Sequence, residues 1–305
     1  MPKISKSVPP AQPAVGTKPV AKKKQTADVD PWDRIAPIGF NDNDGLKMLL
    51  YGSSGTGKTR TWSTFPGPIL AMMCSSVKNP GEARSIDTPE NRKKIFQVPV
   101  YKAEEVLALA HKQAETARFA TVVLDHASGL QDLAMKEILG IDEMPAQLSW
   151  GVATREQWGL GGANCREIIR ALLNLNCHVV IVAQQRDFSD KSEGGDVYSD
   201  LSFPTISAGL TPSLAGWLAP ACDYVCQTFK RPVLKETKLD VGGEEVSTWE
   251  RTGKTEFCAR TGPHDIVTTK FRVPVGIELP DAIVNPTFDK LYNLIKGIKV
   301  TKGSK

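Results

Sequence analysis

The sequence contains no long apolar segment. Its apolar runs fall well short of the roughly 18 residues that a helix needs to cross a bilayer. The N-terminal residues include lysines and prolines but no apolar core of the kind that a secretory signal peptide requires. The sequence therefore predicts a protein without membrane contact, and we expect it in the cytoplasm.

Metal-binding and disulfide patterns are also missing. The chain has six cysteines, and no two of them have the C-x-x-C spacing that is typical of zinc and redox sites. They are Cys74, Cys165, Cys177, Cys222, Cys226 and Cys258. Scattered cysteines indicate reduced thiols in a cytosolic protein and argue against a disulfide framework.

The remaining composition is that of an ordinary soluble domain, with 41% hydrophobic and 24% charged residues. The net charge of +4 permits nucleic-acid binding without requiring it. Residues 1–30 lack aromatic side chains and are rich in proline and lysine, so we expect a disordered tail. The lysines at 22–24 either belong to this solvated tail or contact phosphate groups. One folded domain is expected over 31–297, with a basic tail at 298–305.

Hydrophobic periodicity predicts alternating strands and helices. Apolar runs predict buried strands at 48–51, 68–74, 96–100, 119–125 and 177–184. Amphipathic patterns predict helices at 102–117, 128–139, 162–175 and 286–296. This alternation indicates an α/β fold whose mainly parallel central sheet is covered by helices on both faces. Residues 229–275 are expected to extend the same sheet with antiparallel strands.

A glycine-rich turn follows the first strand. The stretch GSSGTGKT at 52–59 fits G-x-x-x-x-G-K-[ST] at every specified position. Glycines allow positive φ angles and bring several backbone N–H groups to one point, where phosphate oxygens bind. The expected cradle for ATP consists of Gly52, Ser53, Ser54, Gly55, Thr56, Gly57, Lys58, Thr59 and Arg60. In it Lys58 contacts the β- and γ-phosphates, and the Thr59 hydroxyl binds Mg²⁺.

Two later strands end in polar side chains that can complete this site. Asp125 closes the run TVVLD, and we expect it to hold Mg²⁺ opposite Thr59; the alternative is a cap for the next helix. Gln184 closes VVIVAQ, where it either contacts the γ-phosphate and the attacking water or simply ends the strand. No N-K-x-D sequence follows, which disfavours a Ras-like GTPase.

The stretch TKFR at 269–272 alternates as an extended strand does. Lys270 and Arg272 would then present two cations on one side, with Phe271 turned into the core. In a ring or filament such a pair can reach the γ-phosphate held by the neighbouring subunit. The same alternation is typical of any half-exposed strand, so both interpretations remain at this point.

The order of these features resembles that of the RecA-like ATPases. The likeness is closer to the AAA-type ATP-binding proteins of tailed phages, a group that includes single-strand annealing ATPases, and it covers about residues 45–297. Three further short segments resemble the sequences of that group: Gln157-Trp158-Gly159, Asp223-Tyr224-Val225 and Asn285-Pro286-Thr287-Phe288. The resemblance implies a RecA-like P-loop fold, ATP hydrolysis, and a role in trans for Lys270 and Arg272.

One departure from that pattern concerns the catalytic acid. RecA-like proteins usually place a glutamate just after the second strand, where this sequence reads Met73-Cys74-Ser75-Ser76. Glu82 is the nearest substitute, although a loop glutamate is more often only solvated. Slow hydrolysis, or use of the nucleotide as a switch, follows if no acid occupies that place.

Two functions fit these features. The first is an Mg²⁺-dependent ATPase of phage DNA recombination or replication, which acts as a homo-oligomer on single-stranded DNA in the host cytoplasm. A single-stranded-DNA-binding protein is a further candidate partner. The second is a slow, nucleotide-dependent module that recruits another protein through residues 229–260. The acidic stretch at 187–213 is a poor direct groove for DNA, because its charge repels phosphate.

Removal of residues 1–30 is expected to leave the melting temperature and the affinity for ATP unchanged, because the segment contributes no apolar core. Thermal denaturation and nucleotide titration of the truncated protein check this. If the lysines at 22–24 contact DNA, affinity for single-stranded DNA falls and its salt dependence becomes shallower. A large drop in melting temperature would contradict the predicted disorder.

Overall fold

A computed structural model describes residues 45–74, 81–141, 153–188, 205–241 and 244–298. The pattern of contacts divides the chain between residues 41 and 42, and all of the described residues belong to the second unit. The tails predicted at 1–30 and 298–305 lie outside the described residues, apart from Ile298.

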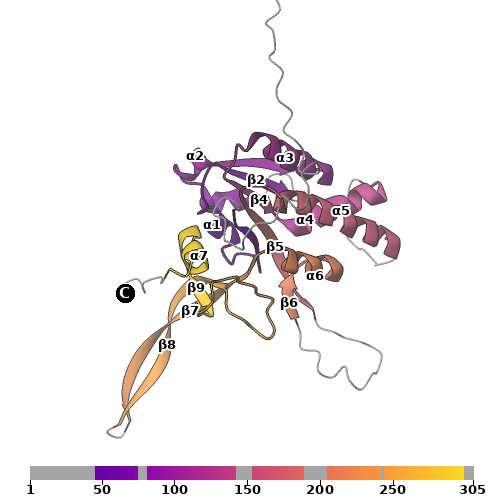
Figure 1. Cartoon of the computed structure of the whole chain (residues 1–305). Helices are drawn as coiled ribbons and strands as arrows, with labels where there is room; N and C mark the ends of the chain where they lie inside the picture. Colours follow the sequence, from indigo (N-terminus) through magenta and orange to yellow (C-terminus); the bar gives the residue numbers. More distant parts are fainter. Residues whose placement is uncertain (1–44, 75–80, 142–152, 189–204, 242–243, 299–305) are drawn as a thin grey trace, which may run out of the picture. The chain divides into compact units, whose positions relative to one another are not determined.

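The centre of this unit is a sheet in which β1 (Lys47–Gly52) lies between two parallel neighbours, β5 (His178–Phe188) and β7 (Tyr224–Val241). The other strands are β2 (Ile69–Cys74), β3 (Ile95–Val100), β4 (Thr121–Asp125), β6 (Thr205–Ala208), β8 (Glu244–Arg260) and β9 (Ala282–Val284). Their order is β3-β2-β4-β5-β1-β7-β8-β9, with β6 paired to β5 beyond the end of β1 (Figure 1). All pairs from β3 to β7 are parallel, as the apolar runs predict, whereas β8 and β9 are antiparallel.

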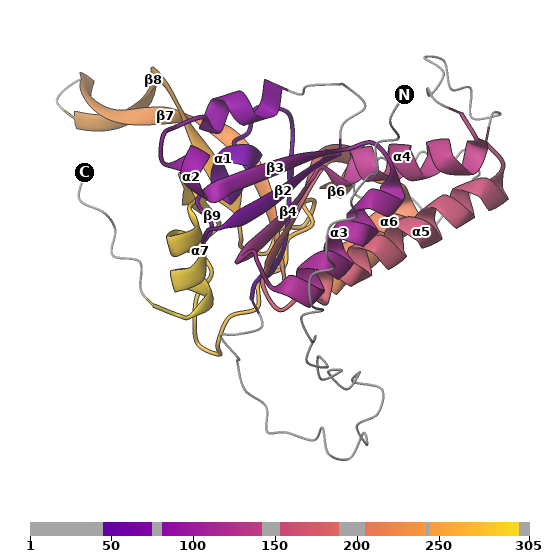
Figure 2. The ribbon, with the colours of Figure 1, turned by 90° about the horizontal axis from the view of Figure 1, so that it is seen from above.

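Helices cover both faces of this sheet (Figure 2). They are α1 (Lys58–Trp62), α2 (Asn91–Lys94), α3 (Ala103–Thr116), α4 (Ala127–Leu139), α5 (Arg155–Leu173), α6 (Pro212–Ala221) and α7 (Phe288–Ile295), with the 3₁₀ helix η4 (Gly81–Ile86). In one apolar cluster the four helices from α3 through α6 pack against Leu49 and Tyr51 of β1. In the other cluster, α1 and α7 pack against Met48 and Leu50 of the same strand. Successive residues of β1 therefore face opposite layers, which is why the strand is apolar throughout. Among the described residues, no helix combines the length and apolar character needed to span a membrane.

The element boundaries depart from the predictions in informative places. Helix α5 begins seven residues before the expected 162, at Arg155, because Thr154 and Gln157 form a reciprocal cap that starts it. The short β6 and helix α6 were not predicted at all. The prediction of a strand at 269–272 is wrong, because Lys270 forms only an isolated bridge, to Val225, and the segment does not pair as a strand. From Gln227 onward the outer edge of β7 is already paired with β8, so no further bridge can form there.

The cysteines occupy this interior. All six are buried and none forms a disulfide. Burial raises the pKa of the Cys165 and Cys222 thiols to about 12. These groups pack as small apolar side chains, and the reactive thiolate form is suppressed.

Gly129→Ala is expected to destabilise the protein by about 1–3 kcal/mol, because a Cβ at this position of α4 would overlap the backbone carbonyl oxygen of Cys74 in β2. Backbone groups cannot move aside as a flexible side chain can. Gly159→Ala in α5 is the matched control, since its Cβ would meet no atom within 4 Å and alanine favours a helix. Urea unfolding of both variants checks the prediction, which equal stabilities would contradict.

Candidate nucleotide site

The predicted phosphate cradle lies at the carboxyl edge of the parallel strands. Gly52, the last residue of β1, is in register with Gln184 of β5 on one side and Thr228 of β7 on the other. Asp125 ends the neighbouring strand β4. Ligands of open parallel sheets gather at this edge, since the strand ends and the turns that follow meet there. The structure thus brings three separately predicted segments to one place.

The glycines of the loop serve two different purposes. Gly55 and Gly57 have φ angles of 70° and 93°, which a residue with a side chain rarely adopts. Gly52 instead permits a close approach, because a Cβ there would overlap the Thr228 carbonyl and hydroxyl oxygens. The Thr228 hydroxyl also lies 2.7 Å from the hydroxyl of Thr56. The loop is therefore braced by β7 as well as by its own turns.

Lys58 directs its ammonium group into this loop. The side chain is only 8% exposed, and Nζ donates to the carbonyl oxygens of Gly52 and Ser53, each at 2.8 Å. It also lies 3.4 Å from Oε1 of Gln184. A cation held at the mouth of a glycine-rich turn is positioned to neutralise the terminal phosphates of a nucleotide. Helix α1, which begins at Lys58, spans five residues, so the loop's N–H groups dominate over any helix dipole.

Asp125 is 4% exposed, and its Oδ2 accepts a hydrogen bond of 2.9 Å from the indole Nε1 of Trp62. This bond fixes the orientation of the carboxylate toward the loop side of the sheet. The alternative role as a helix cap falls to the next residue, since Nδ1 of His126 accepts the N–H of Gly129 at the start of α4. Trp62 was not predicted, because nothing in its local pattern distinguishes it from a core residue.

These side chains share a cavity of about 310 Å³. Its lining residues are Ser54, Gly55, Gly57, Lys58, Thr59, Arg60, Ser85, Asp125, Gln184 and Phe257. The hydroxyl of Thr59 and the carboxylate of Asp125 are hard oxygen ligands of the type that Mg²⁺ prefers, so the residues fit this ion. Ser85 and Phe257 were missed, because only the packing of η4 and β8 against the loop brings them here.

The position of Gln184 differs from the prediction in one respect. The strand does not end there but continues to Phe188, and residues 185–188 pair with the antiparallel β6. The amide nevertheless faces the cavity at the level of Gly52. Glu82 lies in η4, the segment that also carries Ser85, while its side chain lies outside the described part of the chain.

Lys270 and Arg272 lie far from this cavity within the same chain. Lys270 Nζ donates to the carbonyl oxygens of Pro220 and Cys222, at 2.8 and 2.6 Å, and Arg272 pairs with Asp223 at 2.6 Å. All of these partners precede β7, at the amino edge of the sheet. Burial, and next the charge of Arg272, lower the pKa of Lys270. Phe271 packs against Tyr224, with ring centroids 5.2 Å apart, as the alternation predicts.

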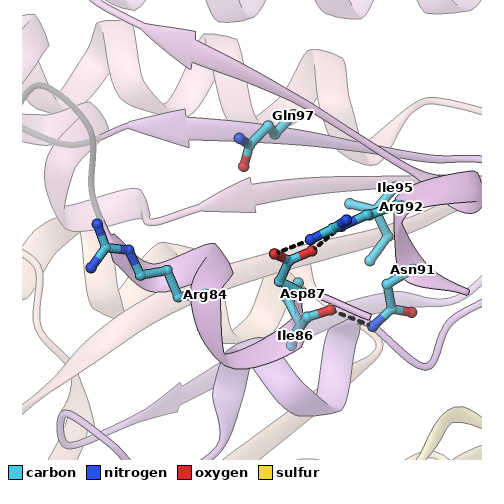
Figure 3. A pocket seen from close by; sticks show the side chains of 7 residues that line it. All are labelled: Arg84, Ile86, Asp87, Asn91, Arg92, Ile95 and Gln97. Atoms are coloured by element: carbon cyan, nitrogen blue, oxygen red, sulfur yellow. Dashed lines mark hydrogen bonds and ion pairs between the residues drawn. The ribbon is translucent and has the colours of Figure 1, made fainter. Parts of the chain in front are cut away.

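A second hollow of about 420 Å³ opens beside η4, α2 and β3 (Figure 3). Its charged side chains bind one another: Arg92 Nη2 donates to Asp87 Oδ2 at 2.8 Å, and this pairing lowers the pKa of Asp87. Arg84, which points elsewhere, contributes a further cation (Figure 3). Because the charge of Arg92 is already paired with Asp87 and the lining includes no glycine-rich turn, this larger hollow offers no comparable phosphate cradle.

The fold and the cavity together define an α/β domain of the P-loop ATPase type. The family of AAA domains matches residues 44–258, and the chain belongs to that family. No curated protein matches the chain significantly. Membership implies binding of a nucleotide, typically with Mg²⁺, and suggests nucleotide hydrolysis. The match begins just before β1 and ends within β8, so it includes every segment that lines the cavity.

Asp125→Asn is expected to keep ATP binding but lower Mg²⁺-dependent hydrolysis by about 10²-fold or more, because the amide removes the charge. The amide oxygen can still accept the Trp62 hydrogen bond, so the fold should be preserved. Hydrolysis rates at varied Mg²⁺, with a fluorescent ATP analogue for affinity, check this. Asp265→Asn, which removes an exposed carboxylate outside the cavity, is the control. Normal Mg²⁺ dependence in the Asp125 variant would leave that residue a purely structural role.

Proposed function

We propose that the protein is an Mg²⁺-dependent ATPase that acts as an oligomer on single-stranded DNA in phage recombination or replication. The observation that supports the ATPase assignment is the convergence of Lys58, Thr59, Asp125 and Gln184 on one cavity. These four side chains come from three elements that are distant in sequence, α1, β4 and β5. Such a set is difficult to account for by packing alone, since it buries a lysine and a carboxylate at the same edge of a sheet.

Each residue of the cavity has a distinct role in this proposal. The N–H groups of the loop and the ammonium of Lys58 bind the phosphate chain and neutralise the charge that develops as the γ-phosphate leaves. Thr59 and Asp125 would hold Mg²⁺, which when bound bridges phosphate oxygens and withdraws charge from them. The Gln184 amide orients the attacking water or contacts the γ-phosphate. Arg60 also lines the cavity.

We assign the base that activates water to Glu82, the acid nearest to the place where RecA-like proteins carry a catalytic glutamate. Its segment η4 packs against α1, and Ser85 of the same segment lines the cavity. Without a carboxylate at this place, water would be only positioned and not deprotonated, and hydrolysis would be slow. A slow rate would favour use of ATP as a switch.

The assignment to DNA and to phage recombination rests on the order of motifs, which resembles that of the single-strand annealing ATPases. The proposed oligomer gains support from the position of Lys270 and Arg272. Val225, the bridge partner of Lys270, pairs with Leu49, three residues before Gly52, and the ammonium extends further away from the loop. At about 3.3 Å per residue the pair lies too far from its own cavity, so a role in catalysis requires a neighbouring subunit.

A second candidate function is an ATP-dependent module that recruits another protein. The β7–β8 hairpin favours it, because β7 pairs with β1 only as far as Thr228 and the remainder runs on with β8 alone (Figure 1). This free part carries Leu234 and Trp249, which are 48% and 63% exposed. Exposed apolar side chains on an extended arm are typical of protein-binding surfaces. Stimulation of ATP turnover by single-stranded DNA separates the two functions, since only the first requires it.

Lys58→Ala and Arg272→Ala are each expected to lower ATP turnover by about 10²-fold or more, through loss of one charge at the terminal phosphates. A mixture of the two inactive proteins should regain activity, because an intact Arg272 of one subunit meets an intact cavity of the other. Turnover per subunit should also rise with protein concentration and with single-stranded DNA. Lys254→Ala, on the exposed hairpin, is a suitable charge control.

Three results would count against parts of this proposal. Full turnover by a folded Lys58→Ala protein would remove the P-loop assignment. A mixture that co-assembles, as shown by size-exclusion chromatography, yet stays inactive would restrict Arg272 to supporting Asp223 in its own chain. Turnover unaffected by single-stranded DNA would favour the recruitment function.

A further inference from the structure

The base of the β7–β8 hairpin forms an outer wall of the phosphate-binding loop. Thr228 and Lys230 of β7 lie two residues apart in an extended strand, so their side chains point to the same side. Thr228 contacts Thr56 of the loop through hydroxyl groups 2.7 Å apart. The side of the hairpin that carries Lys230 therefore faces the loop.

Lys230 and Phe257 form a cross-strand pair on that side. The Nζ atom of Lys230 lies 3.4 Å from the position that a Cβ of Gly55 would take, and the Phe257 ring lies 3.2 Å from the corresponding position at Gly57. The ammonium is also 5.9 Å from the centroid of the Phe257 ring, and the guanidinium of Arg60 is 6.0 Å from it. A cation thus stands over the apex of the loop, with an aromatic ring beside it.

The next residue of β7 behaves differently. Arg231 points to the opposite side of the hairpin, where it pairs with Glu256. No ion pair found among the described residues includes Lys230. Its charge is therefore directed at the loop and not balanced by one of those carboxylates. Lys58 enters the loop from the α1 side, so the two lysines flank the loop from different elements.

We propose that Lys230 is a second phosphate-contacting cation, supplied within the same chain, and that it binds the terminal phosphate of ATP. This inference rests on the proposed nucleotide site and deepens it. Lys230 belongs to the hairpin, whereas the other phosphate ligands proposed to act within their own chain belong to the loop, α1 and β5. The hairpin would consequently be drawn toward the loop by ATP and released when the γ-phosphate is lost.

Lys230→Met tests the proposal, because it removes the charge while keeping the aliphatic stem against Phe257. A charge-assisted contact to the terminal phosphate should be lost with ATP and not with ADP. We expect the dissociation constant for a fluorescent ATP analogue to rise by about ten-fold or more, while that for the ADP analogue changes by less than about three-fold. Lys230→Arg should restore ATP affinity. Lys235→Met, an exposed position further along β7 opposite Glu250, is the matched control and should bind as the wild type does.

The contrary outcomes are distinct. Equal weakening of ATP and ADP binding would mean that Lys230 only supports the loop through Phe257. Unchanged binding of both nucleotides would mean that Lys230 does not contact a phosphate group. Either result overturns the inference. A wild-type protein that binds neither analogue would overturn the proposed nucleotide site as well. A thermal denaturation curve for each variant excludes unfolding as the cause of lost binding.

Discussion

The placement of Gly52 between two parallel neighbours is the constraint on which the site depends. One backbone position is in register with Gln184 on one side and with Thr228 on the other. Since the β7 carbonyl and hydroxyl oxygens approach too closely for a side chain at Gly52, the loop leaves β1 directly against β7. The same register sets Lys58 beside the Gln184 amide and Thr56 beside the Thr228 hydroxyl. A one-residue slip of β5 would break the first contact and a slip of β7 would break the second, because every side chain of the slipped strand would change faces.

The electrostatic design of the cavity follows from this geometry. Cationic groups approach the loop from two elements, Lys58 from α1 and Lys230 from β7, while Asp125 is buried at the end of β4. A buried carboxylate costs free energy unless it is hydrogen-bonded or paired, and the Trp62 indole offsets part of that cost. A carboxylate that is held in this orientation and lines the same cavity as the Thr59 hydroxyl is an oxygen ligand of the kind that Mg²⁺ prefers.

The sequence was informative wherever function depends on a contiguous stretch. The cradle at 52–60 and Asp125 could be predicted, because a turn of fixed chemistry and the end of a buried strand are both local features. Phe257 and Lys230 could not, since Lys230 reaches the loop through the pairing of β7 with β1, and Phe257 through its own pairing with Lys230. Hydrophobic periodicity also does not indicate which strands pair with each other. That is why the alternation at 269–272 predicted a strand where β8 already covers the edge that a strand would need.

The residues proposed to bind the nucleotide and those proposed to act in trans lie at opposite edges of the sheet. The nucleotide cavity lies at the carboxyl edge, and Lys270 and Arg272 are held at the amino edge by Cys222 and Asp223. Surfaces at opposite edges of one subunit can meet in a head-to-tail assembly, which closes as a ring or continues as a filament. The hairpin that borders the cavity would then contact the nucleotide at its base and extend beyond the sheet. Under this arrangement, hydrolysis of ATP alters the anchoring of an arm rather than the core. An arm that pairs with β1 over only its first five residues can move at far lower cost than the sheet that carries it.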